Sequence, residues 1–157
     1  MSDETNGQKV PRTHTIRVRV RQSDTDYLGI VYNPVYLDYA MEAVFQHVES
    51  HKFALERLRS LGGYFVVRRH EIDYLRPARA SDELLVTTRI LGMKGLLATR
   101  ATSIVNATTG EQLARAKTDY VFVRDNGRPG HIPRAIIDAF EWGEQSEPAV
   151  GAAGGDA

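Results

Sequence analysis

Two carboxylates, a glycine and a helix start fall within the eleven residues 24–34, DTDYLGIVYNP, and this stretch is where we expect chemistry. Asn33 is a preferred N-cap residue, and Pro34 suits the first helical position because its missing N–H would be unpaired there anyway. A helix start exposes unpaired N–H groups and a partial positive charge, so it can polarise a carbonyl oxygen. A carboxylate held nearby, Asp24 or Asp26, could then attack that carbonyl or activate water.

The hydrophobic pattern on either side predicts the elements that hold this stretch. Residues 14–21 alternate with a period of two, and Ile16, Val18 and Val20 share one face, as in a half-buried strand. From residue 35 to about 59 the period becomes that of an amphipathic helix, with a break expected near 50–53. Gly62 and Gly63 then end the helix.

Four further strands are expected, over residues 64–75, 83–91, 96–107 and 111–124. Short turns at 92–95 and 108–110 predict that the last three strands form an antiparallel meander, and a short helix is expected at 133–142. The order therefore predicts an α+β fold, in which an antiparallel five-stranded sheet wraps around one long central helix. The sheet faces expected to meet the helix are Leu97, Thr99, Ala101, Ser103 and Val105, and Ala114, Ala116, Thr118, Tyr120 and Phe122.

Composition limits the class of protein. The 157 residues predict one domain at 14–142 with polar or Gly/Ala tails at 1–13 and 143–157. Twenty basic and twenty acidic side chains cancel, which argues against a global attraction to nucleic acid or an anionic membrane. The chain has no cysteine, so it has no disulfide and no thiol nucleophile. Without a signal-peptide pattern or a membrane-spanning apolar run, a cytoplasmic protein is expected.

Four segments of the chain carry a family resemblance: DTDYLGIVYNPVYLDY at 24–39, FVVRRHEIDYLRPARASDELLV at 65–86, RATSIVNATTGEQLARAKTDYVFV at 100–123 and IPRAIIDAF at 132–140. They are similar to hotdog-fold acyl-CoA thioesterases of the 4-hydroxybenzoyl-CoA thioesterase group, and within it to the Tol-Pal-associated thioesterases. The resemblance covers residues from about 14 to 141. It implies hydrolysis of an acyl-CoA thioester to a carboxylic acid and free CoA without a metal or cofactor. It also implies sites between two subunits of a homodimer, often paired again into a homotetramer.

The resemblance also implies roles for single residues. Asp26 becomes the catalytic carboxylate, as nucleophile or general base, and the backbone N–H of Asn33 polarises the thioester carbonyl, which leaves Asp24 as loop support. Gly29 is expected to shape the backbone path, and Tyr32 either lines the acyl pocket or only packs. The further substrate-binding candidates are Ile30, Val31 and Tyr36, with Arg76, Arg79 and Lys94 as either phosphate contacts or ordinary solvated charges.

One departure from the pattern concerns Asn33, because the Tol-Pal-associated relatives carry a histidine at this position. The asparagine side chain cannot replace a histidine as acid or base, although the main-chain donor survives the change. Histidines occur elsewhere: His47 and His51 are four residues apart on the helix stripe, a spacing that can bind a metal. No third ligand accompanies them, so packing is the expected role and no metal site is predicted.

Two alternatives to an acyl-CoA thioesterase stay open. The first is the same hydrolysis on an acyl or polyketide chain carried by an acyl carrier protein. The second is a non-catalytic acyl-CoA binding module on the same fold. The acyl group itself is not predicted, because Tyr32, Tyr36, Tyr39 and Phe45 could line an aryl or an aliphatic pocket.

Overall fold

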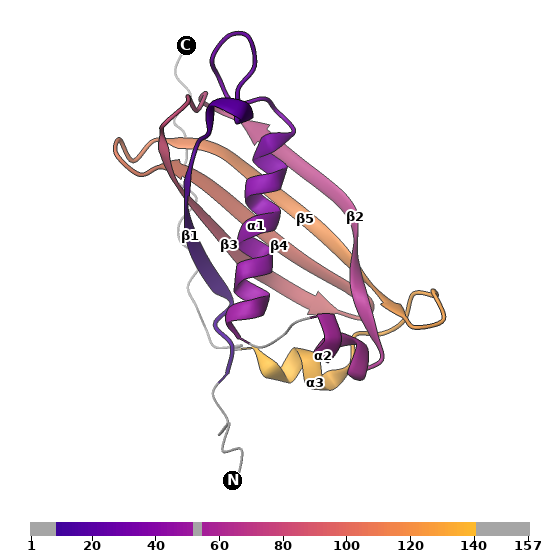
Figure 1. Ribbon diagram of the computed structural model, residues 1–157. Coiled ribbons are helices and arrows are strands. Elements are labelled where there is room, and N and C mark those ends of the chain that lie inside the picture. Colours follow the sequence, from indigo (N-terminus) through magenta and orange to yellow (C-terminus); the bar gives the residue numbers. More distant parts are fainter. Residues whose placement is uncertain (1–8, 52–54, 141–157) are drawn as a thin grey trace, which may run out of the picture.

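The computed structural model describes residues 9–51 and 55–140 (Figure 1). The predictions for residues 1–8 and 141–157, which include most of both expected tails, lie outside this range. In chain order the elements are β1 (Thr13–Arg19), the 3-10 turn η1 (Gln22–Asp24), α1 (Val35–Ser50), α2 (Leu55–Ser60), β2 (Gly63–Tyr74), β3 (Glu83–Lys94), β4 (Leu97–Asn106), β5 (Gln112–Arg124) and α3 (Arg134–Ala139).

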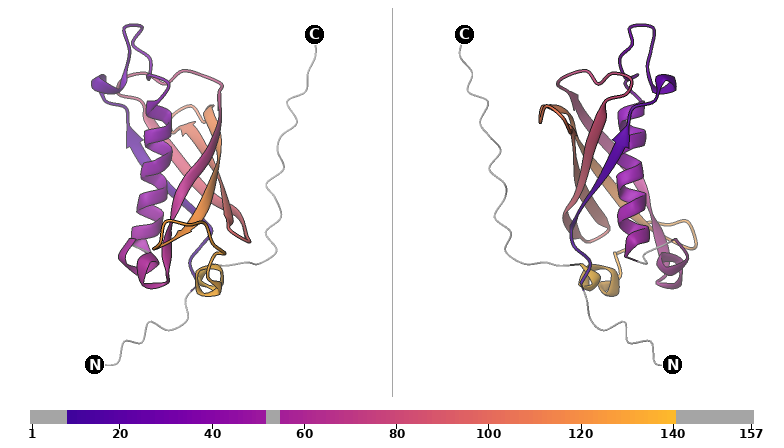
Figure 2. Two further views of the ribbon diagram at one scale, coloured as in Figure 1. Left: turned by 90° about the vertical axis from the view of Figure 1, so that its right-hand side faces the viewer. Right: turned by 60° about the vertical axis from the view of Figure 1, so that its left-hand side comes forward.

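One antiparallel sheet of five strands carries the fold, in the order β1-β3-β4-β5-β2. Helix α1 runs along one face of this sheet, and the sheet curves around it (Figures 1 and 2). The predicted α+β architecture and the β3-β4-β5 meander are therefore confirmed. Strands β1 and β2 form the two edges, so among the described residues each has one side without a strand partner.

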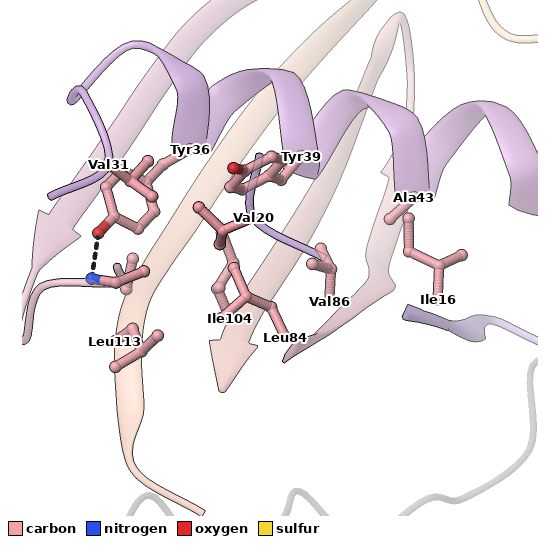
Figure 3. Close-up of a cluster of buried hydrophobic side chains, with 12 residues drawn as sticks. Ile16, Val20, Val31, Tyr36, Tyr39, Ala43, Leu84, Val86, Ile104 and Leu113 are labelled. Carbon is pink, nitrogen blue, oxygen red and sulfur yellow. Dashed lines mark hydrogen bonds between the residues drawn. The ribbon is translucent and has the colours of Figure 1, made fainter. Parts of the chain in front are cut away.

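The main core lies between α1 and the sheet (Figure 3). Tyr39 and Ala43 of the helix pack against Ile16 of β1 and Leu84 and Val86 of β3. The sheet side chains in this cluster are mostly branched (Ile16, Leu84, Val86, Ile104 and Leu113), and Ala114 is the one short side chain that the sequence had placed on the inner face. This packing fixes the N-terminal end of α1, and the stretch 24–34 with it, at one end of the sheet.

The expected break in the long helix is confirmed, whereas the expected turn at 92–95 was wrong. Helix α1 ends at Ser50 and α2 begins at Leu55, and residues 52–54 between them lie outside the described residues. The turn is shorter than predicted, because Lys94 pairs with Leu97 across only two residues. Gly92 lies inside β3, beside a shift in register.

The inward face of β4 was also predicted wrongly. Its buried side chains are Ala98, Arg100, Thr102 and Ile104, and the expected set from Leu97 to Val105 is only partly buried on the opposite face. An arginine is among the residue types least often buried, so alternation read from hydrophobicity favoured the wrong face. Arg100 is nevertheless only 8% exposed.

The two ends of the described chain meet beneath the sheet. Val10 donates its N–H to the carbonyl of Ala139 at 2.7 Å and forms a bridge with Phe140. Val10 is buried with Ile90, Phe122 and Ile136 in a second apolar cluster. The packed structure thus begins before residue 13. Among the described helices, none combines the length and apolar character needed to span a bilayer.

Candidate active site

The motif forms a short hairpin in front of α1. Tyr32 donates its N–H to the carbonyl of Asp24 at 2.9 Å, and Asp26 donates to Ile30 at 2.9 Å. Gly29 has a φ of +75° in the turn, a conformation that side chains with a Cβ rarely adopt. The glycine is therefore needed for the backbone path, as the sequence indicated.

The loop between β2 and β3 anchors this hairpin to the sheet. Val31 donates to the carbonyl of Ala78 at 2.8 Å, and Ile30 forms a bridge with Arg79. The N–H of Ala78 donates in turn to the hydroxyl of Tyr36 at 3.1 Å (Figure 3). Val31 and Tyr36, both substrate-binding candidates, are core side chains that hold the hairpin in place.

Asp24 is buried and fully engaged. Its carboxylate accepts hydrogen bonds from the backbone N–H and the guanidinium of Arg21 and from the hydroxyl of Tyr39, at 2.8 Å for the last. Burial alone would raise the pKa of Asp24, but the hydrogen bonds from Arg21 and Tyr39 outweigh it and hold the pKa below its ordinary value. A carboxylate kept ionised and surrounded in this way serves as an anchor for the loop.

Asp26 differs from Asp24 in having a carboxylate oxygen to spare. Its Oδ1 atom accepts the N–H of Leu28 at 2.8 Å, a local bond that fixes the side chain over the turn. Within the described part of the chain, Oδ2 accepts no hydrogen bond. The side chain is partly exposed, so a substrate or a water molecule can reach that oxygen.

The start of α1 was predicted one residue early. Pro34, not Asn33, occupies the N-cap position. No side-chain hydrogen bond caps the helix, and the side chain of Asn33 is exposed. The carbonyl of Asn33 accepts the hydroxyl of Tyr74 at 3.2 Å. The N–H of Asn33 donates to no acceptor in residues 9–51 or 55–140. It can therefore donate a hydrogen bond to an oxygen atom of a bound molecule.

The remaining candidates divide between the two ends of the sheet. Arg76 and Arg79 are exposed on the loop that holds the hairpin, and Tyr32 is 57% exposed beside it. Lys94 lies at the far end of β3, whose twelve residues extend over about 35 Å. One chain therefore does not bring Lys94 together with Asp26.

Residues 20–140 match the sequence profile of the thioesterase-like superfamily. The chain belongs to this superfamily. Membership confirms the predicted family and, with it, the thioesterase class. It leaves the association with a Tol-Pal system a prediction.

Similar proteins in the thioesterase-like superfamily include the acyl-CoA thioester hydrolase YbgC of Escherichia coli O6:H1, which is 32% identical over 79% of this chain and 92% of its own. A thioesterase from Thermus thermophilus, whose structure contains coenzyme A and zinc, is 32% identical with a TM-score of 0.70, over 80% of this chain and 95% of its own. A 1,4-dihydroxy-2-naphthoyl-CoA thioesterase from Synechocystis is 27% identical with a TM-score of 0.73, over 81% and 94%. These solved structures confirm the hotdog fold.

This thioesterase-like chain also contains a polar cluster under the second half of α1 that sequence reasoning missed. His47 accepts the Arg100 guanidinium at Nδ1, at 3.0 Å, and its Nε2 lies 2.7 Å from the carbonyl of Pro11. Burial, followed by the charge of Arg100, lowers the pKa of His47 to about 4, so its imidazole is neutral at pH 7. Both ring nitrogens are therefore occupied. Within the described ranges no group of three metal-ligating side chains occurs.

Proposed function

We propose that the protein hydrolyses an acyl-CoA thioester to a carboxylic acid and free CoA. The observation that carries this proposal is that Asp26, in the hairpin, has a fixed carboxylate with a spare oxygen, while Asn33, directly after the hairpin, has an N–H without an acceptor among the described residues. Membership of the thioesterase-like superfamily supports the same reaction class. YbgC and the CoA-containing Thermus thermophilus protein support CoA as the thiol.

In this reaction Asp26 acts as general base or as nucleophile. As a base it removes a proton from water while the water oxygen attacks the thioester carbon; as a nucleophile it forms a mixed anhydride that water then hydrolyses. On either route the carbon–sulfur bond breaks and the CoA sulfur leaves with the electron pair and takes up a proton. A positioned general base contributes about 10²–10⁴-fold to the rate.

The N–H of Asn33 is the proposed donor to the carbonyl oxygen. That oxygen gains negative charge in the tetrahedral intermediate, so a donor already aimed at it stabilises the transition state by roughly 3–4 kcal/mol. The main-chain group performs this role whatever the side chain, so the asparagine in place of histidine leaves the step intact. The neighbouring positive end of α1 adds to the effect.

Arg76 and Arg79 are the proposed contacts for the phosphates of CoA. Both are exposed on the loop that borders the hairpin, and guanidinium groups suit phosphate oxygens because two parallel N–H bonds can form. Gly29 and Ile30 provide the main chain beside Asp26, and Tyr32 lies on the exposed side of the same hairpin. Lys94 reaches this site only from a second copy of the chain.

A homodimer through the edge strand β2 is the proposed assembly. Val66 and Val67 of β2 are both exposed, and Val67 lies with the exposed Phe45 of α1 and Leu55 of α2 around one cavity. A two-fold axis at β2 makes the two α1 helices antiparallel, so the Asp26 end of one chain lies beside the other end of its partner. Light scattering should give at least twice the mass of one chain, and Val67→Pro should reduce it.

A panel of short, long and aromatic acyl-CoA thioesters, with release of free thiol as the readout, tests the proposed reaction. We expect turnover of at least one of them. The same acyl groups on pantetheine, which lacks the adenine nucleotide, separate the alternatives, because a carrier-protein enzyme should lose little rate on them. Binding without hydrolysis across the whole panel would contradict the proposal and favour a binding module.

A further inference from the structure

A cavity of about 470 Å³ opens between the second half of α1 and strands β2, β4 and β5. Its volume is in the range of small-molecule sites. Most of its lining is apolar, including Val44, Val48 and Phe65; its charged lining residues are the buried Arg100 and the exposed Glu49 at the end of α1. The cavity is separate from the hairpin that carries Asp26, because its first lining residue on α1 is Met41, about 9 Å along the helix from Val35.

Arg100 has donors that the chain leaves unused. Only Nη1 is occupied: it donates to Nδ1 of His47 at 3.0 Å and to the hydroxyl of Thr88 at 3.3 Å. In the described residues Nε and Nη2 find no acceptor, and neither is a fully buried atom, so each keeps some accessible surface. The side chain is more than nine-tenths buried, so these donors lack the full hydration they would have on a surface.

The charge of Arg100 is also unbalanced. No carboxylate pairs with it in the part of the chain that the structure describes, and the imidazole beside it is neutral. Burial lowers the pKa of Arg100 only to about 10, so the group stays a cation at pH 7. A buried cation without a counter-ion is costly unless a ligand supplies the charge.

A phenol completes the polar part of the wall. Tyr120 pairs with Ala98 across β4 and β5, two residues along from the pair formed by Arg100 and Thr118. Its hydroxyl has only the sulfur of Met41 as a partner in the described residues, at 3.5 Å, and sulfur is a weak acceptor. The hydroxyl can therefore donate to a ligand oxygen in the cavity that Arg100 also lines.

We infer that this cavity selects acyl groups that carry a carboxylate at the end remote from the thioester, which Arg100 and Tyr120 bind while the apolar walls enclose the methylene chain. The inference rests on the proposed thioester hydrolysis and specifies its substrate class. Because the cavity is separate from the hairpin that carries Asp26, the carboxylate lies several carbons from the reacting carbonyl, whichever chain supplies Asp26. In the proposed dimer, the cavity of one chain adjoins the Asp26 end of the other.

Matched pairs of substrates test this selection: adipoyl-CoA against hexanoyl-CoA, and suberoyl-CoA against octanoyl-CoA. The wild-type protein should favour the carboxylated member of at least one pair by about 10- to 100-fold in kcat/KM, the effect of hydrogen bonds to a charged partner. In Arg100→Met, an apolar replacement, the preference should disappear because the carboxylated substrate loses more kcat/KM than its uncharged partner. Arg17→Met, which alters an exposed arginine of β1, is the matched control and should keep the preference.

Two results would overturn the selection. One is equal kcat/KM for both members of every pair in the wild-type protein. The other is an equal loss on both members in Arg100→Met, which would assign the guanidinium a structural role or a carboxylate partner on a second chain. If Arg100→Met does not fold, Tyr120→Phe takes its place, and its preference should fall by about 3- to 10-fold.

A binding measurement separates failure of this inference from failure of the proposed reaction. Non-hydrolysable thioether analogues of suberoyl-CoA and octanoyl-CoA are titrated into the wild-type protein by calorimetry. Tighter binding of the carboxylated analogue by about tenfold or more supports the selection even if no thioester is hydrolysed. Equal binding overturns it even if octanoyl-CoA is a good substrate.

Discussion

At the N-terminal end of α1, polar groups are held by main-chain hydrogen bonds on a partly exposed hairpin, whereas along its second half one guanidinium lies among apolar side chains. The hairpin fixes Asp26 through Leu28 and leaves one carboxylate oxygen available. Beside the cavity, hydrogen bonds to His47 and Thr88 fix Arg100 and leave two of its nitrogens available. In both regions, some atoms of a charged group form hydrogen bonds within the chain that hold the group in place, and its other polar atoms are available to a ligand.

The difference lies in burial. A reacting carboxylate must exchange protons with water, so partial exposure suits Asp26. A recognition group gains strength when water is excluded, so deep burial suits Arg100. Together the two proposals place a reacting end and a recognition end on one helix, and each prediction below changes one of them.

Replacing Asp26 should have the largest effect. Asp26→Asn keeps the shape of the side chain and removes the base, so kcat should fall by about 10²–10⁴-fold, or about 3–5 kcal/mol of transition-state stabilisation. The melting temperature should stay near that of the wild type. Asp125→Asn, in the exposed turn after β5, is the control and should retain full activity.

Replacing Asp24 tests the anchoring of the hairpin. Asp24→Ala removes the acceptor of the buried Tyr39 hydroxyl and of the Arg21 N–H, so the free energy of unfolding should fall by about 2–3 kcal/mol. Urea denaturation measures this change, with Asp125→Ala as the exposed control. A stability equal to that of the wild type would mean that Asp24 does not support the loop.

The pH dependence of stability tests the recognition end. His47 is packed against His14, His51 and Arg100, and its folded pKa of about 4 lies below the ordinary 6.5, so the folded state favours the neutral ring. The stabilisation of the folded state by the neutral His47 ring is complete above pH 6.5. As the pH falls toward 4 it is lost, and the free energy of unfolding decreases by about 2 kcal/mol after allowance for solvent screening. His47→Gln should lack this component in urea titrations at pH 7 and about pH 4.5. Equal losses in both proteins would contradict it.

The smallest expected effect is at Gly29. An alanine there meets no atom within 4 Å, so only the φ of +75° opposes it and the cost should be about 1 kcal/mol of stability. Gly92→Ala also meets no atom within 4 Å and requires no positive φ, so it is the matched control. Equal stability of the two variants would remove the conformational reason for the glycine.

The reacting end could be predicted from sequence because it is local. The carboxylates, Gly29 and the start of α1 lie within one short motif, and hairpin hydrogen bonds join residues a few positions apart. The alternation of β1 and the turn between β4 and β5 are local in the same sense, and between β3 and β4 the hairpin, though not the position of its turn, was predicted. These local patterns were enough to predict the sheet and the helix.

The recognition end could not be predicted because it is assembled from distant segments. Arg100, His47 and Pro11 are neighbours only after the sheet wraps around α1, and a buried arginine contradicts the hydrophobic alternation used to choose the inner face of β4. The bond from Tyr39 to Asp24 is likewise a tertiary contact. The apolar Ala98 and Ile104, which share a face with Arg100, were the one local signal that indicated the correct face.

The most direct test of the separation between the two ends measures turnover and binding on the same Asp26→Asn protein. Calorimetry with the thioether analogue of suberoyl-CoA gives Kd, and thiol release from suberoyl-CoA gives kcat. The account predicts a Kd within about threefold of that of the wild type, with kcat at least about 100-fold lower. Turnover close to that of the wild type would contradict the assignment of Asp26.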